Sequence, residues 1–255
     1  MKFRPCIDIH NGSVKQIIGG SLTDSGNQAV DNFISGQNAA FYAKKYREDG
    51  LSGGHIILLN PKGTEFYEAD VRQAKSALEE YPGGMQIGGG MDEGNAEKFL
   101  AMGASHIIVT SYVFRDGMIY MERLKRMASL LGKEHLVLDL SCRYAGDDYY
   151  IVTDRWQKVT KVKMNRQTLE MLAEFCDEFL IHAVDVEGKA SGVEKEVVRR
   201  LGERRVLPVT YAGGIHSLED IDWIREAGNG FIDFTVGSAL DLFGGTLPYQ
   251  ELLQI

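Results

Sequence analysis

The sequence predicts a (β/α)8 barrel, a TIM barrel with an internal two-fold half-barrel repeat, formed by residues 1–255 as a single domain. Three observations predict it: eight short runs rich in β-branched residues, helical patterns between them, and similarity between the two halves of the chain. Eight strand–helix units in a chain of roughly 250 residues match the usual size of such a barrel. A doubly wound sheet ranks second, because it usually has fewer strands at this length.

The predicted strands are often apolar at consecutive positions, which is typical of parallel strands covered on both faces. They span residues 2–9, 55–59, 85–88, 106–111, 135–140, 179–186, 205–212 and 231–237.

Helical periodicity separates these runs. Leu169, Leu172 and Ala173 follow the spacing of one helix face, and Ser217 with Asp220 predicts the capped start of another helix. Strand–helix alternation favours parallel βαβ units.

Two connections are long, residues 10–38 and 141–164, and both follow a predicted strand. The runs VKQII and YYIV…WQKV predict hairpins within them, and a Gly/Ser/Asn-rich run occupies 19–28. Loops of this length are usually lids, binding loops or disordered segments. In a barrel both lie at the C-terminal ends of the strands, where active sites are built.

The composition excludes several classes of function. The net charge of −8 does not suit a broad basic face for nucleic acid. Three widely spaced cysteines argue against a disulfide framework or a zinc knuckle, so we expect the cytoplasm. No apolar run approaches the roughly 20 residues of a membrane span, and no signal-peptide pattern is present.

The two halves of the chain, about 1–132 and 133–255, are similar to each other. Segments 86–114 and 211–240 each contain a strand, a glycine pair, a helix and a second strand. The pairs separated by about half the chain are Gly90 with Gly214, Ser111 with Ser238, and Asp8 with Asp139. In an eightfold barrel such pairs face each other, and a barrel closed in this way is expected to be a monomer.

The glycine pairs predict anion sites, because a strand running into Gly-Gly and then a helix lets backbone N–H groups approach a phosphate. The alternative is an ordinary tight turn, but two copies in register favour two phosphates on one elongated ligand. The first predicted site comprises Gly89, Gly90 and Ser111, and the second comprises Gly213, Gly214, Gly237 and Ser238.

Asp8 and Asp139 each end an apolar strand. A single such aspartate is usually a helix cap or a turn residue. A pair that flanks a bound sugar suits general acid/base catalysis, and we expect a catalytic role for both.

Other polar residues have two interpretations each. His55 and His182 are equally well explained as ligand contacts or as buried histidines bonded to backbone, and Trp156 as a stacking platform or as rim packing. No metal-binding spacing of histidines occurs, so no metal site is expected. The candidate anion contacts, for which solvated surface is the alternative, are Arg143, Arg155, Lys15 and Arg166.

Several motifs together resemble the ProFAR isomerase family of histidine biosynthesis, in its eukaryotic-type branch. They are CIDIHNGSVKQIIGG, QIGGGM, VLDLSCR, FLIHAVDVEG, YAGGI and VGSALDLFGG, and they cover nearly the whole chain. The resemblance implies an Amadori rearrangement, from aminoaldose to aminoketose, of a nucleotide carrying two phosphates, with no cofactor or metal. It implies that Asp8 removes the proton from sugar C2, that Asp139 protonates the ring oxygen, and that Trp156 stacks on the aminoimidazole.

The chain also departs from the bacterial pattern. Ala183 follows His182 where a threonine is usual, Ser141 is a candidate replacement, and LSCR leaves the place of Arg143 open. The alternatives are the cyclase barrel of the same pathway, a dual isomerase that also converts phosphoribosyl anthranilate, and a catalytically silent phosphate-binding barrel.

Overall fold

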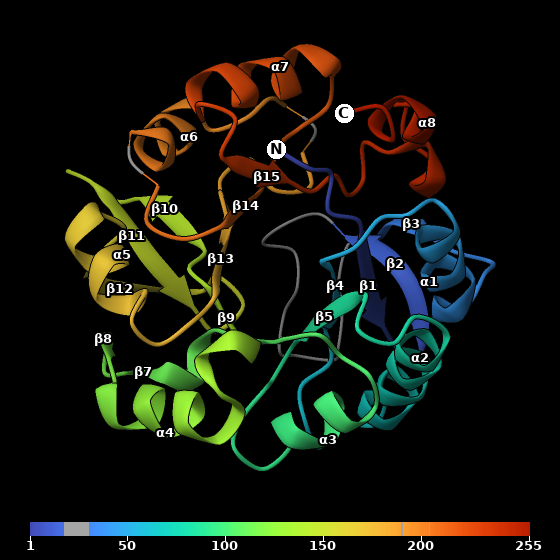
Figure 1. Cartoon of the computed structure of the whole chain (residues 1–255), viewed down its shortest axis with the longest axis horizontal. Helices are drawn as coiled ribbons and strands as arrows, with labels where there is room; N and C mark the ends of the chain where they lie inside the picture. Colours follow the sequence, from blue (N-terminus) through green and yellow to red (C-terminus); the bar gives the residue numbers. More distant parts are fainter. Residues whose placement is uncertain (18–30, 190, 204) are drawn as a thin grey trace.

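The computed structural model describes residues 1–17, 31–189, 191–203 and 205–255. Over these residues, eight parallel strands form a ring surrounded by helices (Figure 1). In ring order they are β1 (Cys6–His10), β4 (Gly54–Leu58), β5 (Met85–Gly88), β6 (Ile107–Val109), β9 (Leu136–Asp139), β13 (Glu178–His182), β14 (Val209–Ala212) and β15 (Ile232–Phe234).

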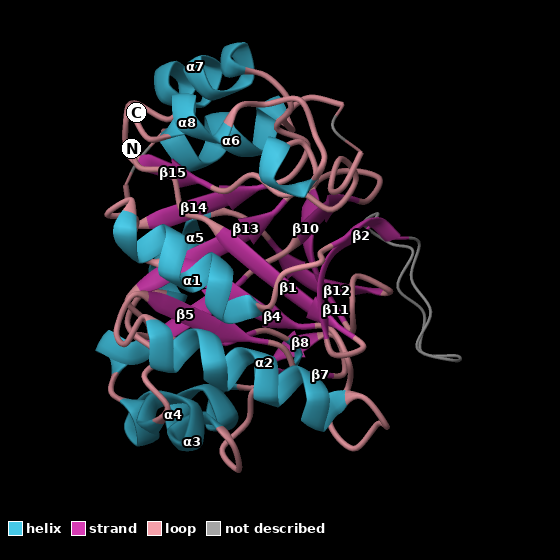
Figure 2. Cartoon of the chain, turned by 90° about the vertical axis from the view of Figure 1, so that its right-hand side faces the viewer, coloured by secondary structure: helices cyan, strands magenta, loops and turns pink. Residues whose placement is uncertain are grey.

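Backbone hydrogen bonds close the ring between β15 and the residues before β1. Phe3 forms a parallel bridge with Phe234, whose carbonyl accepts from Arg4 N–H at 2.8 Å and whose N–H donates to the Lys2 carbonyl at 3.0 Å. The predicted barrel is therefore confirmed, and the chain starts and ends at the same end of it (Figure 2).

A helix follows each strand of the ring and covers its outer face (Figure 1). The helices are α1 (Ala39–Glu48), α2 (Tyr67–Glu80), α3 (Ala96–Ala101), α4 (Met121–Leu131), α5 (Arg166–Leu172), α6 (Lys195–Gly202), α7 (Leu218–Ala227) and α8 (Tyr249–Leu252). The predicted cap of α7 is confirmed, because Ser217 Oγ accepts a hydrogen bond from Asp220 N–H at 3.3 Å. Within the described ranges, no helix has the length and apolarity needed to cross a membrane.

Additional strands extend the end of the barrel opposite the termini (Figure 2). They are β2 (Ser13–Ile17), β3 (Asp31–Ile34), β7 (Phe114–Arg115), β8 (Met118–Ile119), β10 (Cys142–Tyr144), β11 (Tyr149–Thr153) and β12 (Lys158–Lys163). The hairpin predicted in 141–164 is confirmed as β11–β12, and VKQII forms β2, which pairs with β1 and β3. The Gly/Ser/Asn-rich run at 19–28 lies outside the described residues.

Several predicted strands run past the observed ones at an end, among them 2–9 against β1 and 231–237 against β15, and two further cases have a clear physical reason. The run 179–186 was expected to be extended throughout, but β13 stops at His182 and the chain turns, with Val186 N–H donating to the Ala183 carbonyl at 3.2 Å. The run 205–212 begins its strand only at Val209, after Pro208, which has no N–H to donate to a ladder.

A buried polar cluster fills the barrel near its N-terminal end. Glu178 is 4% exposed and accepts hydrogen bonds from Gln86 Nε2 at 3.0 Å and from Thr210 Oγ1 at 2.7 Å. A guanidinium nitrogen of Arg4 lies 3.7 Å from the same carboxylate. The charge is thus paired and hydrogen-bonded, as burial requires.

We predict that Glu178→Ala lowers the free energy of unfolding by about 3–5 kcal/mol, because it leaves Gln86 and Thr210 without their acceptor inside the barrel and removes one of the two carboxylates beside Arg4. Urea unfolding measures this. Glu79→Ala is the control: Glu79 pairs with Lys75 but is 57% exposed, so a loss below about 1 kcal/mol is expected. Equal losses for both variants would contradict a structural role for the cluster.

Candidate active site

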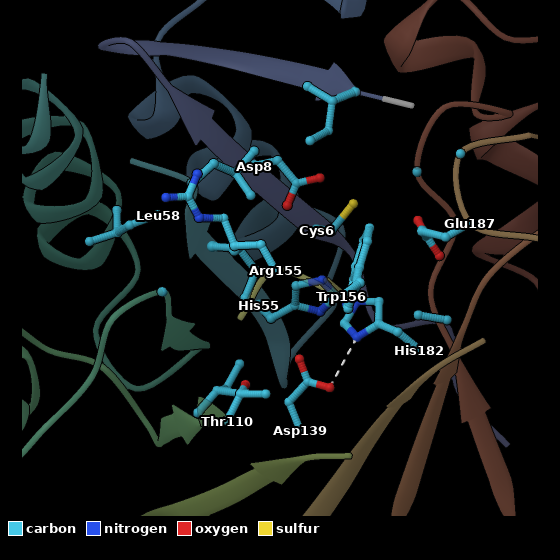
Figure 3. Close-up of a pocket in the computed structure, with 18 of the residues that line it drawn as sticks. Cys6, Asp8, His55, Leu58, Thr110, Asp139, Arg155, Trp156, His182 and Glu187 are labelled. Atoms are coloured by element: carbon cyan, nitrogen blue, oxygen red, sulfur yellow. Dashed lines mark hydrogen bonds and ion pairs between the residues drawn. The ribbon is translucent and has the colours of Figure 1, made fainter. Parts of the chain in front are cut away.

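A cavity of about 520 Å³ opens at the C-terminal end of the strands (Figure 3). Nearly all the residues predicted to act in the site line it. They are Asp8, His55, Gly89, Gly90, Ser111, Asp139, Trp156, Gly213, Gly214, Gly237 and Ser238.

The two aspartates come from opposite sides of the ring. Asp8 lies on β1 and Asp139 ends β9, which are the first and fifth strands of eight in ring order. Figure 3 shows both side chains directed into the same cavity. The glycine turns follow β5 and β14, the third and seventh strands, and so are also opposite each other.

Asp8 lies in an environment that disfavours its charge. Burial raises its pKa to about 7, the carboxylate of Glu187 adds to the rise, and His182 and Gln16 counteract it. Gln16 Nε2 donates to Asp8 Oδ2 at 3.3 Å from strand β2. A carboxyl group with this pKa exchanges a proton readily near neutral pH.

Asp139 is held in the opposite state. Burial alone raises its pKa, but His182 and Ser141 outweigh burial, so the pKa is lowered overall. Ser141 donates to Asp139 Oδ1 twice, from its backbone N–H at 2.9 Å and from its hydroxyl at 2.7 Å. The hydroxyl in turn accepts from Trp156 Nε1 at 3.0 Å. The candidate hydroxyl Ser141 is therefore bonded to the predicted acid.

His182, rather than residue 183, is the side chain that β13 directs into the cavity. Ala183 is buried beside Gly213, and it is not among the described residues that line the cavity. His182 therefore occupies the inward position at the end of β13, and the absence of a hydroxyl at position 183 stays a prediction. His182 Nδ1 lies 3.3 Å from Asp139 Oδ1.

The two glycine turns share an unusual backbone geometry. Gly89 and Gly213 have φ of 99° and 127°, and Gly90 and Gly214 have φ of 68° and 73°. A Cβ on Gly89 would meet the Leu58 backbone, so both turns require glycine for conformation and for space. Such turns let a ligand approach the backbone closely.

Trp156 enters the cavity from the tip of the β11–β12 hairpin. Its ring lies 5.8 Å from the His182 ring between centroids, tilted by 47°. Asp154, Arg155 and Trp156 have positive φ values of 53°, 54° and 66°, a left-handed run that is costly for residues other than glycine. The tip is thus held in a defined conformation that directs Arg155 and Trp156 inward.

Comparison with known proteins identifies the relatives of this site. A family model described as histidine biosynthesis protein matches residues 2–247. The chain belongs to this family.

Relatives in plants and fungi carry the systematic name of ProFAR isomerase. A chloroplastic isomerase of Medicago truncatula is 50% identical over 99% of this chain and 81% of its own length. The isomerase of Yarrowia lipolytica is 44% identical over 96% of this chain and 93% of its own, and that of Saccharomyces cerevisiae 40% identical over 98% and 95%.

Three of the four candidate anion contacts, Lys15, Arg166 and Arg143, are not among the described residues that line the cavity of this histidine-biosynthesis barrel. Arg166 pairs with Glu170 instead. The residue predicted for the site itself that lies away from the cavity is Arg143. Its guanidinium pairs with Asp185 at 2.8 Å, and it is not among the described residues that line the cavity. Arg155, weighed equally in the sequence, does line it.

Among the cavity residues that were not predicted, Gln16 and Glu187 act on the pKa of Asp8. Glu187 follows the end of β13, and its Oε2 is a buried atom without a hydrogen-bond partner among the described residues. The VEG motif that contributes to the family resemblance includes Glu187, so the sequence held a signal for it. Gln16 belongs to the VKQII run and to the CIDIHNGSVKQIIGG motif, but the register that directs its side chain to Asp8 is not visible in the sequence. Within the described ranges, no group of three His, Cys, Asp or Glu side chains is placed to hold a metal ion.

We predict that Glu187→Gln lowers the pKa of Asp8 below about 7, because it removes the negative charge that adds to the effect of burial. A carbon-detected NMR titration of the aspartate carboxyl groups measures the change. Asp185→Asn, in the same loop but paired with Arg143 outside the cavity, is the control and leaves the Asp8 titration unchanged. An unaltered Asp8 titration in Glu187→Gln would contradict the electrostatic link.

Proposed function

We propose that this protein is an aldose–ketose isomerase of histidine biosynthesis that converts ProFAR into its aminoketose by aspartate acid/base catalysis. One observation carries the proposal: Asp8 and Asp139 face each other across a single cavity, in a chain 40–50% identical to proteins that bear this enzyme name.

The substrate spans the cavity. Its two phosphates bind the opposed turns at Gly89–Gly90 and Gly213–Gly214, with Ser111 on the first side and Gly237–Ser238 on the second. The matching left-handed glycines at the two turns support this arrangement. The ribose that reacts then lies between the two aspartates, and remote phosphate binding is used to position it.

Asp8 acts as the general base that removes the proton from sugar C2. The base works only when ionised, so kcat/KM rises with pH through the Asp8 pKa of about 7 and levels off above it. Gln16 and His182 support the ionised form, and Glu187 opposes it.

The Asp139 side of the cavity protonates the ring oxygen and opens the ring. Trp156 and His55 bound this side, and the indole offers a flat face for the aminoimidazole of the substrate. The hydrogen bond from Trp156 Nε1 to Ser141 Oγ holds the indole by its edge and leaves one face of the indole toward the cavity.

We further propose that the protein acts as a monomer in the cytoplasm on this small molecule alone, without nucleic acid, metal or cofactor. The Medicago relative is named chloroplastic, so the compartment is a separate proposal, tested by cell fractionation.

Asp8→Asn is predicted to lower kcat for ProFAR by about 10²–10⁴-fold, because the amide cannot accept the C2 proton. The change in KM is expected to be small, since the phosphates bind elsewhere. Steady-state assays in metal-chelated buffer measure both constants, with phosphoribosyl anthranilate run in parallel to test the dual-substrate alternative.

Asp185→Asn, outside the cavity, serves as the control and should retain wild-type rates. Wild-type turnover by Asp8→Asn would contradict the role of Asp8 as base. No turnover of ProFAR by the unmodified protein would contradict the proposed function itself.

A further inference from the structure

Asp139 is poorly suited to give up a proton in this structure. Its Oδ1 accepts three hydrogen bonds, two from Ser141 and one from His182, and each of them favours the carboxylate. The pKa of Asp139 is lowered accordingly, even though burial opposes this. At neutral pH this side chain is an anion.

The proton on this side of the cavity lies on His182 instead. The His182 side chain is 11% exposed and lines the cavity. Its Nδ1–H donates to Asp139 Oδ1 at 3.3 Å, and its Nε2 has no hydrogen-bond partner among the described residues. Asp139 thus fixes the imidazole and leaves Nε2–H available to a ligand.

The groups facing His182 come from each element around it. Asp139 on β9, Asp8 on β1 and Glu187 in the loop after β13 carry carboxyl groups, and His55 on β4 places its ring 6.3 Å away between centroids. Burial lowers the pKa of His182, but Asp139 first, then Glu187 and Asp8, raise it to about 9. Burial and His182 together lower the pKa of His55 to about 3, so His55 is neutral and does not compete.

We propose that His182 is a catalytic residue, whose Nε2–H rather than the Asp139 carboxyl protonates the sugar ring oxygen, with Asp139 as its anionic partner. The inference rests on the proposed function and changes the identity of its acid. It also explains why the inward position of β13 holds an imidazole.

The proton balance closes over one turnover. His182 Nε2–H passes its proton to the ring oxygen as the C1–O bond breaks, which leaves a neutral imidazole and an iminium at C1. Asp8 takes the C2 proton, and that electron pair forms the C1–C2 double bond of an enaminol. The Asp8 carboxyl then protonates C1, and the enol proton returns to His182 as the ketone forms.

His182→Asn tests the role with little change of shape, because the Asn amide can still donate to Asp139 but carries no transferable proton. We expect kcat to fall by about 10²–10⁴-fold with a smaller change in KM. In the unmodified protein kcat/KM should also fall as pH rises through about 9, where His182 loses its proton, and this basic limb should vanish in the variant.

Two further variants distinguish the donors. Asp139→Asn should keep its activity at low pH. Its kcat/KM should fall at a lower pH, toward about 6.5, the ordinary histidine pKa, because the carboxylate that raises the pKa of His182 is gone. His55→Gln should leave the basic limb near pH 9. The proposal would be overturned if kcat/KM of His182→Asn still fell near pH 9. It would also be overturned if Asp139→Asn were inactive at every pH while His182→Asn still turned over substrate.

A nitrogen-detected NMR titration of the histidines gives a readout independent of turnover. The His182 signal is assigned by its absence from the spectrum of His182→Asn. It should titrate near pH 9 in the unmodified protein and at a lower pH in Asp139→Asn. A His182 that titrates at or below about 6.5 in the unmodified protein would overturn the inference, whether or not ProFAR is turned over. Absence of turnover with the expected titration would instead reject the proposed function.

Discussion

The backbone hydrogen bonds between Phe234 and residues 2–4 are the constraint on which the site depends. They close a twisted sheet into a ring, and a ring of eight strands places the first strand opposite the fifth and the third opposite the seventh. Asp8 and Asp139 are brought together in this way although 131 positions separate them along the chain. Without closure the same strands would form an open sheet with its two halves far apart.

Inside the ring of strands, burial and hydrogen bonding determine which carboxyl groups are ionised. The carboxyl groups of Asp8, Asp139 and Glu187 and the imidazoles of His55 and His182 lie in one cavity, whose low dielectric makes isolated ions costly. The hydrogen bonds of Ser141 and His182 allow Asp139 to keep its charge, while Asp8, with one amide donor, is left near the midpoint of its titration. Two residues of the same type thus acquire different protonation states, and the difference comes from their surroundings alone.

Much of this was predictable from the sequence. The strand–helix alternation predicted the barrel, and the half-chain spacing of the glycine pairs predicted which residues would meet. The inward position on β13 was not predictable, because the expected strand ran on to 186 and the true strand end decides which of His182 and Ala183 faces the cavity. Arg143 was misplaced for a related reason: the hairpin geometry that directs Arg155 inward depends on left-handed residues that no local pattern indicates. The boundary of the half-repeats near residue 132 stays a prediction.

The left-handed run Asp154–Arg155–Trp156 has a consequence for engineering. Each such conformation costs on the order of 1 kcal/mol or more for a residue with a side chain, so the tip is a place where glycine would make the protein more robust. A selection for thermal tolerance alone would therefore drift toward glycine at these three positions. The price would be a tip free to leave the cavity, taking the indole with it. That this chain keeps bulky residues there marks the tip as a part to exclude from stabilising redesign.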